Sequence, residues 1–295
     1  MPEFPDVTIY VDALKSRIVG RRLEGIRLAN PFLLRTVLPA PADLAGRTVE
    51  SVTRLGKRVV IALEGETWIV VHLMIAGRFR WLAPGAKIPG KLGLAAFDFE
   101  HGSLILTEAG SKRRASLHLL SGHDALDALN RGGVEPLEAS LVEFREALVR
   151  ENHTVKRALT DPRLFSGIGN SYSDEILHRA RMSPMKLTRS MTTDEIARLQ
   201  RAVIDTLTLW TDWLREETGD GFPEKVTAFR DGMAVHGRYG QPCPDCSSPV
   251  QRIVYADNET NYCARCQTEG RLLADRALSR LLKQDWPRSI DEVDG

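Results

Sequence analysis

The chain has 295 residues, of which 43% are hydrophobic and 27% charged, a composition typical of a globular protein with room for two domains and a small appendage. Its formal net charge is +1, so any affinity for nucleic acid must come from local basic patches. No basic segment followed by an apolar core opens the chain, and no apolar run approaches the ~18 residues of a membrane span. These features predict a cytoplasmic protein with no membrane partner.

The first three residues, Met1, Pro2 and Glu3, place a possible nucleophile beside an acid. Removal of Met1 would leave Pro2 with a free secondary amine. An α-amino group titrates near ~8, so part of it is unprotonated at neutral pH and can attack an electrophilic carbon. Glu3 could move protons during that attack. Many proteins begin with these residues for no catalytic reason, so the pattern alone does not establish a site.

The first half of the chain reads as one helix followed by short strands. Pro5 and Gly20 delimit the helix, because proline favours a first turn and glycine a helix end. Runs rich in β-branched residues, punctuated by glycine and proline, then predict a β-sandwich or barrel. These runs are Thr48–Thr53, Arg58–Leu63, Thr67–Leu73, Leu94–Phe99 and Ser103–Thr107. Two basic stretches, at 57–58 and 112–114, fall at or between the strands; a solvated loop is the commoner meaning of either.

The second half is predicted to be helical after a loop at 124–138. Ser140 and Glu143 have capping-box spacing ahead of the first helix, and Thr154–Leu159 forms a second helical piece. The glycine turn at 166–170 then enters a helix at 171–181, whose free N–H groups could bind phosphate, although a plain helix connection would look the same. An amphipathic helix is predicted at Thr193–Thr218.

The cysteines all lie in one late cluster. Cys243 and Cys246 form one C-x-x-C knuckle, Cys263 and Cys266 another, and sixteen residues separate the two. This spacing predicts one structural Zn²⁺ held by four thiolates, with a β-hairpin between the knuckles. Every ligand position would be filled by protein, so the metal would have no open site for catalysis.

Taken together, these motifs resemble the formamidopyrimidine-DNA glycosylase/endonuclease VIII family over almost the whole chain. Each motif is modest, but their order and spacing are specific. They are Met1-Pro2-Glu3-Phe4-Pro5-Asp6, Gly56-Lys57-Arg58, His72-Leu73-Met74-Ile75-Ala76-Gly77, Gly167-Ile168-Gly169-Asn170-Ser171-Tyr172, and the four-cysteine finger followed by Gln267.

The resemblance implies a multidomain α+β fold. We expect an N-terminal helix with a β-sandwich domain (1–124), a linker (125–139), a helix-two-turn-helix DNA-binding domain (140–222), a connector with the zinc finger (223–288) and a tail (289–295). It also implies a bifunctional base-excision repair enzyme, a glycosylase and AP lyase that acts as a monomer on double-stranded DNA containing oxidised bases or abasic sites, in the cytoplasm at the nucleoid. Oxidised purines, namely 8-oxoguanine and formamidopyrimidines, are the expected substrates.

In the family's mechanism, Pro2 would attack C1′ and form a Schiff base, after which β- and δ-elimination cut the strand. Glu3 would be the acid/base in sugar ring opening, and Lys57 would hold a phosphate near the lesion. DNA contacts are implied for a further set of residues, in which Ile75 takes the apolar wedge position and Arg113 that of the arginine beside it. The set is His72, Ile75, Arg113, Arg114, Lys156, Asn170, Tyr172 and Asn258.

Three departures from the family pattern bear on specificity and turnover. Arg114 stands where members often carry an aromatic residue, and Leu92-Gly93-Leu94 replaces a common His-x-His pattern. Asn258 stands where the finger usually has an arginine that grips phosphate, so it brings no charge, and Arg252 or Arg265 would have to compensate. Preference for oxidised pyrimidines therefore stays open, as does a non-catalytic zinc-finger protein that binds damaged DNA. An RNA-binding zinc ribbon would not explain Pro2.

Overall fold

In the computed structural model, the described residues are 1–110, 112–224, 226–227, 229–255, 258–274, 280–282 and 287–292. The chain divides into two compact units. The first comprises Met1–Arg131 with Trp210–Ala228, and the second Gly132–Leu209 with Phe229–Gly295. The five-part division expected from the sequence stays a prediction.

The first unit begins with helix α1 (Phe4–Ile18), close to the predicted range. The N–H of Glu3 donates to Asp6 Oδ2 at 2.8 Å, which gives a hydrogen-bond partner to an amide at the helix start that has none within the helix. Gly20, at φ +75°, follows the end of the helix. The apolar side chains of α1 are buried around nearly the whole helix: Val7, Ile9, Tyr10, Val11, Leu14 and Ile18. A helix buried in this way fixes the chain start against the domain core.

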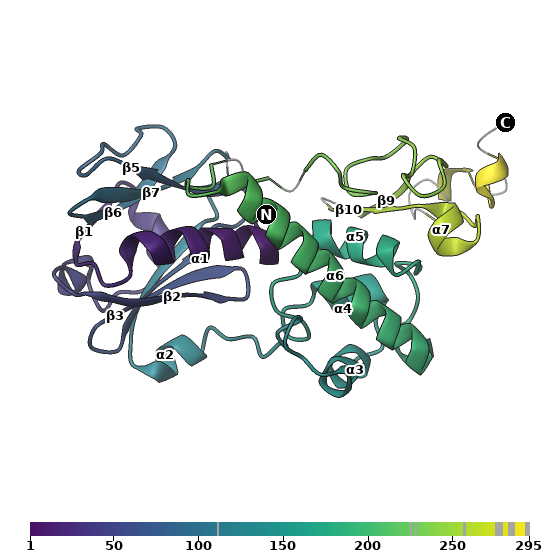
Figure 1. Ribbon diagram of the computed structural model, residues 1–295, viewed down its shortest axis with the longest axis horizontal. Coiled ribbons are helices and arrows are strands. Elements are labelled where there is room, and N and C mark those ends of the chain that lie inside the picture. Colours follow the sequence, from purple (N-terminus) through teal and green to yellow (C-terminus); the bar gives the residue numbers. More distant parts are fainter. Residues whose placement is uncertain are drawn as a thin grey trace. The chain divides into compact units, whose positions relative to one another are not determined.

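Two antiparallel sheets form a sandwich in the described part of the first unit, and α1 runs alongside them (Figure 1). One has the order β1-β6-β7-β5, with bounds Leu23–Leu28, Gly93–Phe99, Gly102–Glu108 and Gly77–Leu82. The other has the order β2-β3-β4-β8, with bounds Val49–Leu55, Arg58–Leu63, Thr67–His72 and Ser116–Ser121. The inner faces and α1 share one apolar core, which confirms the predicted sandwich.

All five predicted strands are present, as β2, β3, β4, β6 and β7, with ends that differ by at most two residues. Strands β1, β5 and β8 were not predicted. Their sequences, LEGIRL, GRFRWL and SLHLLS, mix polar or charged residues with few β-branched ones. Their pairing with long neighbouring strands, rather than local propensity, determines their conformation.

A short helix, α2 (His123–Asp127), lies in the stretch predicted to be a loop, and that part of the prediction is wrong. Ala125 and Leu126 pack on the outer face of the second sheet, against Val60, Trp68 and Leu120. The helix forms because this outer face is apolar at one end and must be covered.

The second unit contains helices α3 (Leu141–Val149), α4 (Val155–Thr160) and α5 (Asn170–Arg179). The capping box is confirmed: the N–H of Ser140 donates to Glu143 Oε2 at 2.8 Å, and the N–H of Glu143 to Ser140 Oγ at 3.3 Å. Gly167, at φ +81°, makes the predicted turn into α5. Helix α6 (Thr193–Thr218) has the predicted bounds and contributes residues to both units.

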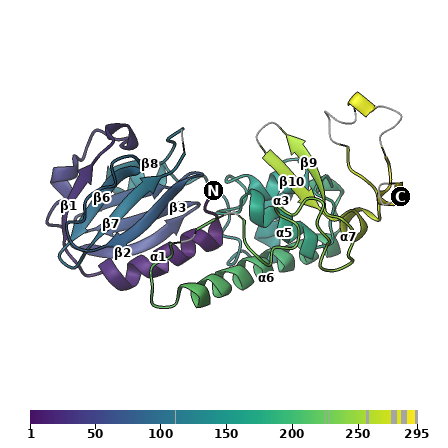
Figure 2. The ribbon, with the colours of Figure 1, turned by 90° about the horizontal axis from the view of Figure 1, so that it is seen from above.

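A hairpin of β9 (Gln251–Tyr255) and β10 (Asn258–Tyr262), followed by α7 (Ala264–Thr268), makes up the C-terminal finger (Figure 2). The strands pair from Asn258 opposite Tyr255 to Tyr262 opposite Gln251, which confirms the predicted hairpin. Strand β10 lies against α5. Short 3₁₀ turns occur at Pro31–Leu33, Pro41–Leu44, Thr188–Ser190 and Ile290–Glu292.

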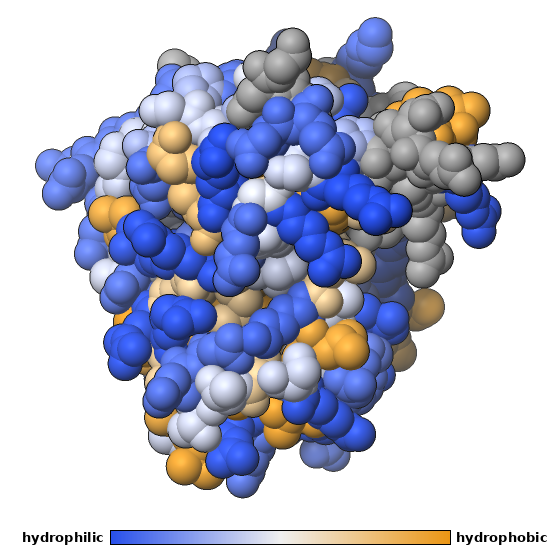
Figure 3. All heavy atoms as spheres, turned by 90° about the vertical axis from the view of Figure 1, so that its right-hand side faces the viewer, coloured by the Kyte–Doolittle hydropathy of each residue, from blue (hydrophilic) through white to orange (hydrophobic). Residues whose placement is uncertain are grey.

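Hydrophilic side chains dominate the side of the second unit that faces the viewer in Figure 3, and apolar residues are scattered among them. Among the helices that the structure describes, none combines the length and apolar character needed to cross a bilayer.

Candidate active site, DNA-contact residues and metal centre

Pro2 and Glu3 are buried where the chain enters α1. Burial is the main reason that the pKa of the terminal amine, here that of Met1, lies below its ordinary value. The positive charges of Arg78 and Lys57 lower this pKa as well, whereas the carboxylates of Glu3 and Asp6 raise it. Removal of Met1 would leave the free amine on Pro2, one residue further into the same surroundings. A lower pKa leaves a larger fraction of the amine unprotonated, and so nucleophilic, at neutral pH.

Lys57 occupies the tight turn between β2 and β3, next to Gly56 at φ +61°. Burial lowers the pKa of Lys57, and the negative charge of Glu3 opposes that shift. Glu3 and Lys57 therefore both lie near the chain start that holds Pro2, although Lys57 is more than fifty residues away in sequence. Arg78, at the start of β5, joins this group and was not singled out from the sequence.

The turn that carries Ile75 joins β4 to β5. A Cβ at Gly77 would lie 2.2 Å from the carbonyl oxygen of Leu73, so only glycine fits there. Ile75 is 59% exposed, so it is not a residue of the core. Burial and the charges of Arg58, Lys57 and His118 lower the pKa of His72 to about 4, so its imidazole is neutral at pH 7.

Arg113 and Arg114 are exposed in the loop between β7 and β8, where Ser111 lies outside the described residues. The buried carboxylate of Glu108 accepts hydrogen bonds from the backbone N–H groups of Arg114 and Ala115, at 3.0–3.3 Å. Arg113 donates to the carbonyl of Lys91. Glu108 thus holds the backbone of the loop from the protein interior, and the guanidinium groups of Arg113 and Arg114 lie at the surface.

The remaining predicted DNA contacts belong to the second unit. Asn170 begins α5, and its Nδ2 donates to the carbonyl of Glu259 at 2.9 Å, which ties α5 to β10. Lys156 donates to Asp174, and also to Ser173 Oγ at 3.0 Å. Tyr172 is 1% exposed, so its ring packs inside the unit. Asn258 is the first residue of β10; its side chain lies outside the described part of the structure.

Two buried acids of α5 organise the connector to the finger and were missed from the sequence. Glu175 accepts the N–H groups of Ala234, Val235 and His236 at 2.7–2.9 Å. Asp174 Oδ2 accepts from His236 Nδ1 at 2.8 Å, while its other oxygen accepts from Lys156. The sequence signal for this role was the presence of two adjacent acids in a helix whose neighbouring residues are buried. Buried carboxylates need hydrogen-bond donors, so such a pair predicts donors from another segment.

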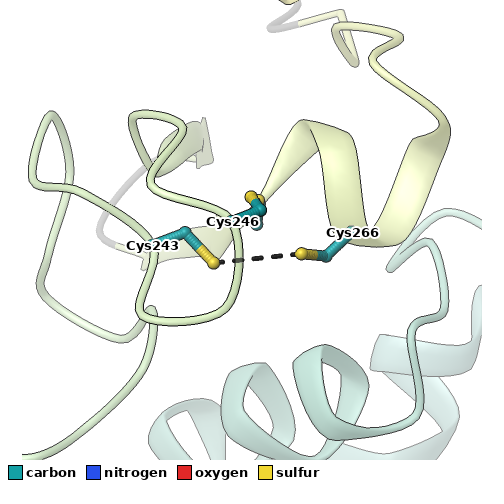
Figure 4. Close-up of side chains that lie close together, drawn as sticks. Cys243, Cys246 and Cys266 are labelled. Carbon is teal, nitrogen blue, oxygen red and sulfur yellow. Dashed lines mark hydrogen bonds between the residues drawn. The ribbon is translucent and has the colours of Figure 1, made fainter.

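The four cysteines converge as predicted. Cys243 and Cys266 point their sulfur atoms toward each other (Figure 4), and the Sγ atoms of all four cysteines lie within 4.8 Å of one another. Cys243 and Cys266 are 3.9 Å apart, and Cys246 and Cys263 3.4 Å, too far for disulfides. Tetrahedral zinc with Zn–S bonds of ~2.3 Å requires sulfur separations of about 3.8 Å. The residues therefore fit one zinc ion.

A second group, His178, Asp245 and Cys266, is also close enough to hold a metal, but it shares Cys266 with the first. Four thiolates suit Zn²⁺ better than this mixed set with an exposed carboxylate. His178 Nε2 lies 3.3 Å from Cys243 Sγ and can donate its N–H to the thiolate. His178 therefore supports the finger from α5 rather than competing for its metal.

Comparison with known proteins matches the chain along most of its length. The model of the formamidopyrimidine-DNA glycosylase N-terminal domain matches residues 1–116, and that of the H2TH domain of the same glycosylase matches 133–211. A zinc finger found in FPG and IleRS matches 240–268.

Relatives named formamidopyrimidine-DNA glycosylase include one from Thermus thermophilus, 34% identical, with 92% of this chain and 100% of the relative covered. Another, from Heliobacterium modesticaldum, is 32% identical, with coverage of 90% and 100%.

Similar solved structures are protein–DNA complexes. One is MutM with DNA containing carbocyclic 8-oxo-G, at a TM-score of 0.80 and 26% identity, covering 90% of this chain and 100% of that one. Another is Lactococcus lactis Fpg with DNA containing an abasic site, at 0.79 and 25%, covering 90% and 99%. From the domain matches, the relatives and the shared fold, the chain belongs to the formamidopyrimidine-DNA glycosylase/endonuclease VIII family.

Proposed function

We propose that this protein is a bifunctional DNA glycosylase and AP lyase of base-excision repair that acts on oxidised purines in double-stranded DNA. The observation that carries the proposal is the buried chain start, where a terminal amine of lowered pKa lies among Glu3, Lys57 and Arg78. The relatives' names and the lesion-bearing DNA in the similar structures support the substrate class.

In the proposed reaction, the amine of Pro2 attacks C1′ of the damaged nucleoside and the C1′–N bond to the base breaks, so the base leaves with the bonding electrons and takes up a proton. Glu3 protonates the sugar ring oxygen as the ring opens, which leaves an iminium between Pro2 and C1′. Loss of a proton from C2′ expels the 3′ phosphate, and a second elimination expels the 5′ phosphate. Lys57 holds a phosphate beside the reacting sugar.

C1′ is hidden in a stacked duplex, so the damaged nucleotide must leave the stack at a cost of a few kcal/mol. Ile75, apolar and exposed at a turn, would fill the gap, with Arg113 beside it and Arg114 next in the loop. His72, neutral at pH 7, would donate a hydrogen bond to a phosphate.

On the second unit, Asn170 and Lys156 would contact backbone phosphates at the start of α5, while the buried Tyr172 would support that turn from within. Asn258 would contact a phosphate without adding charge. Zinc, held by the four cysteines, would fix the shape of the finger. We further propose that the protein works as a monomer in the cytoplasm, at the nucleoid.

Borohydride trapping tests the proposal directly. Protein whose Met1 is shown by mass spectrometry to be removed is mixed with duplexes carrying 8-oxoguanine or an abasic site, and reduction converts any iminium into a permanent crosslink. Extending the N-terminus by one residue turns the Pro2 amine into an amide and should abolish the crosslink while DNA binding persists. A crosslink on the abasic duplex alone would support the lyase activity but not excision of 8-oxoguanine. Duplexes with other damaged bases, oxidised pyrimidines first, would then be tested.

No crosslink on either duplex would overturn the proposal. It would favour the alternative of a non-catalytic protein that binds damaged DNA, for which the replacement of the usual finger arginine by Asn258 is the supporting observation.

A further inference from the structure

The outer face of the sheet β2-β3-β4-β8 changes character along its length. Side chains alternate across a strand, and the register places Val60, Val70 and their neighbours on the face covered by α2. Arg58 is two residues from Val60 and pairs with His72, which pairs with Ser116. His118 pairs with Val70. Arg58, His72 and His118 therefore share this outer face, beyond the end of its apolar part.

Arg58, His72 and His118 form a group of basic side chains, which we call the outer basic cluster. Among the described residues, no carboxylate forms an ion pair with Arg58, His72 or His118. The Arg58 guanidinium donates to the carbonyl of Leu129, at 3.2 Å. His118 Nδ1 is buried and has no hydrogen-bond partner in the described structure.

Positive charge surrounds the cluster from neighbouring elements. After burial, the charge of Arg131 lowers the pKa of Arg58, and those of Arg58 and Arg35 lower the pKa of His118. Arg35 and Arg131 are both exposed. Arg58 thus lies near a second arginine, and nearby positive charge keeps the two histidines in their neutral form.

We propose that the outer basic cluster binds a phosphodiester of the DNA backbone, in addition to the phosphate held by Lys57. Arg58 would supply the bidentate charged contact, and His72 and His118 would donate neutral hydrogen bonds. Lys57 and Arg58 are adjacent in sequence and sit where the turn meets β3, so the cluster begins beside the proposed catalytic group. This inference rests on the proposed function, since it requires DNA as the ligand.

The salt dependence of DNA binding tests the cluster. Affinity for a short duplex carrying a tetrahydrofuran abasic analogue is measured by fluorescence anisotropy over a series of KCl concentrations. R58Q should make the slope of log Kd against log salt shallower by about 0.9, the value for one phosphate contact. R58K keeps the charge and should restore the wild-type slope. R80Q removes an exposed arginine of β5 outside the cluster and serves as the charge-matched control.

A second arm locates the contact. Single methylphosphonates, which remove one phosphate charge each, are placed in turn along the duplex, and the penalty of each is compared in wild type and R58Q. The proposal expects one linkage whose penalty disappears in R58Q, and H118N should weaken binding by about fivefold, as loss of one neutral hydrogen bond does. Circular dichroism checks that each variant is folded.

The two proposals fail separately. Wild-type protein that neither binds DNA nor crosslinks to it would overturn the proposed function. Wild-type protein that binds and crosslinks, while R58Q matches R80Q in salt slope and shows the wild-type penalty at every linkage, would overturn the phosphodiester site alone. Inorganic phosphate at millimolar concentration and constant ionic strength gives a further check. If it displaces DNA from wild type and from R58Q equally, the phosphodiester site at Arg58 is also contradicted.

Discussion

The basic side chains near the chain start in the first unit and the charged side chains of α5 in the second unit differ in how they are paired. In the second unit, Lys156 pairs with Asp174, which also binds His236, and Glu175 accepts three backbone N–H groups. In the described part of the first unit, Lys57, Arg58 and Arg78 form no ion pair with any carboxylate. Both regions bury charge or half-bury it, but among the described residues only the α5 region holds its charges in ion pairs.

The difference separates scaffold from ligand site. A buried charge is costly unless it is paired, so the satisfied network around α5 holds the connector and finger in place and adds stability. The uncompensated cations of the first unit gain their partners only when an anion arrives. A phosphodiester chain supplies such anions, and a cationic site that is already assembled pays little reorganisation on binding. The largest effects on chemistry should therefore arise in the first unit.

Glu3→Gln should cause the largest loss. The amide cannot donate a proton to the ring oxygen, so crosslinking should slow by about 10²- to 10⁴-fold at saturating DNA, while affinity for the abasic-analogue duplex changes little. Single-turnover trapping measures the rate. Asp6→Asn is the control, because Asp6 is a neighbouring acid whose role is to accept the N–H of Glu3. An equal loss in both variants would show that the carboxylates matter only through the helix start.

Removal of the finger metal should affect the second unit without touching the chemistry of the first. Cys246→Ser should reduce the zinc content from about one ion per chain to near zero, because a structural site needs all four ligands. DNA affinity should fall with it, and the crosslinking rate of the complex that still forms should persist. Metal analysis and anisotropy measure the two effects.

Asp245→Asn separates the two possible metal groups, since Asp245 belongs only to the group with His178. It should keep its zinc. If Asp245→Asn loses its zinc while Cys246→Ser keeps it, the metal is held by the group with His178, and the assignment to four cysteines is wrong.

Sequence patterns predicted the parts of this molecule that depend on local spacing. The cysteine knuckles, the capping box at Ser140, the glycine turn before Asn170 and the bounds of α6 each occupy a short window, so residue types and intervals suffice. Pro2 and Glu3 were proposed as catalytic residues from their chemistry, and Lys57 from the family resemblance; their roles stay a prediction.

What could not be predicted depends on contacts between distant strands. Strands β1, β5 and β8 lack a strong pattern of their own, and α2 forms only because an apolar outer face needs cover. The outer basic cluster requires the register that sets Arg58 beside His72 and brings in His118 from β8. No interval in the sequence encodes that register, because it is set by the packing of the whole sheet.

The smallest effect should come from Arg78, which acts on the amine at a distance. Its positive charge disfavours the protonated amine and so lowers the pKa. Arg78→Gln should raise that pKa, which leaves less free amine at neutral pH and slows crosslinking there by about fivefold or less, as expected for one partly screened charge. Above the ordinary α-amino value of ~8, the two proteins should converge, because both amines are then free.

The pH profile of crosslinking distinguishes this electrostatic role from a structural one, since Arg78 also donates to the carbonyl groups of Ile75 and Gly77. A structural defect would slow the reaction equally at every pH. A shift of the acid limb to higher pH, with the alkaline plateau unchanged, would show that an unpaired cation tunes the nucleophile, as the contrast between the units requires. Arg80→Gln, two residues along the same strand, should leave the profile in place.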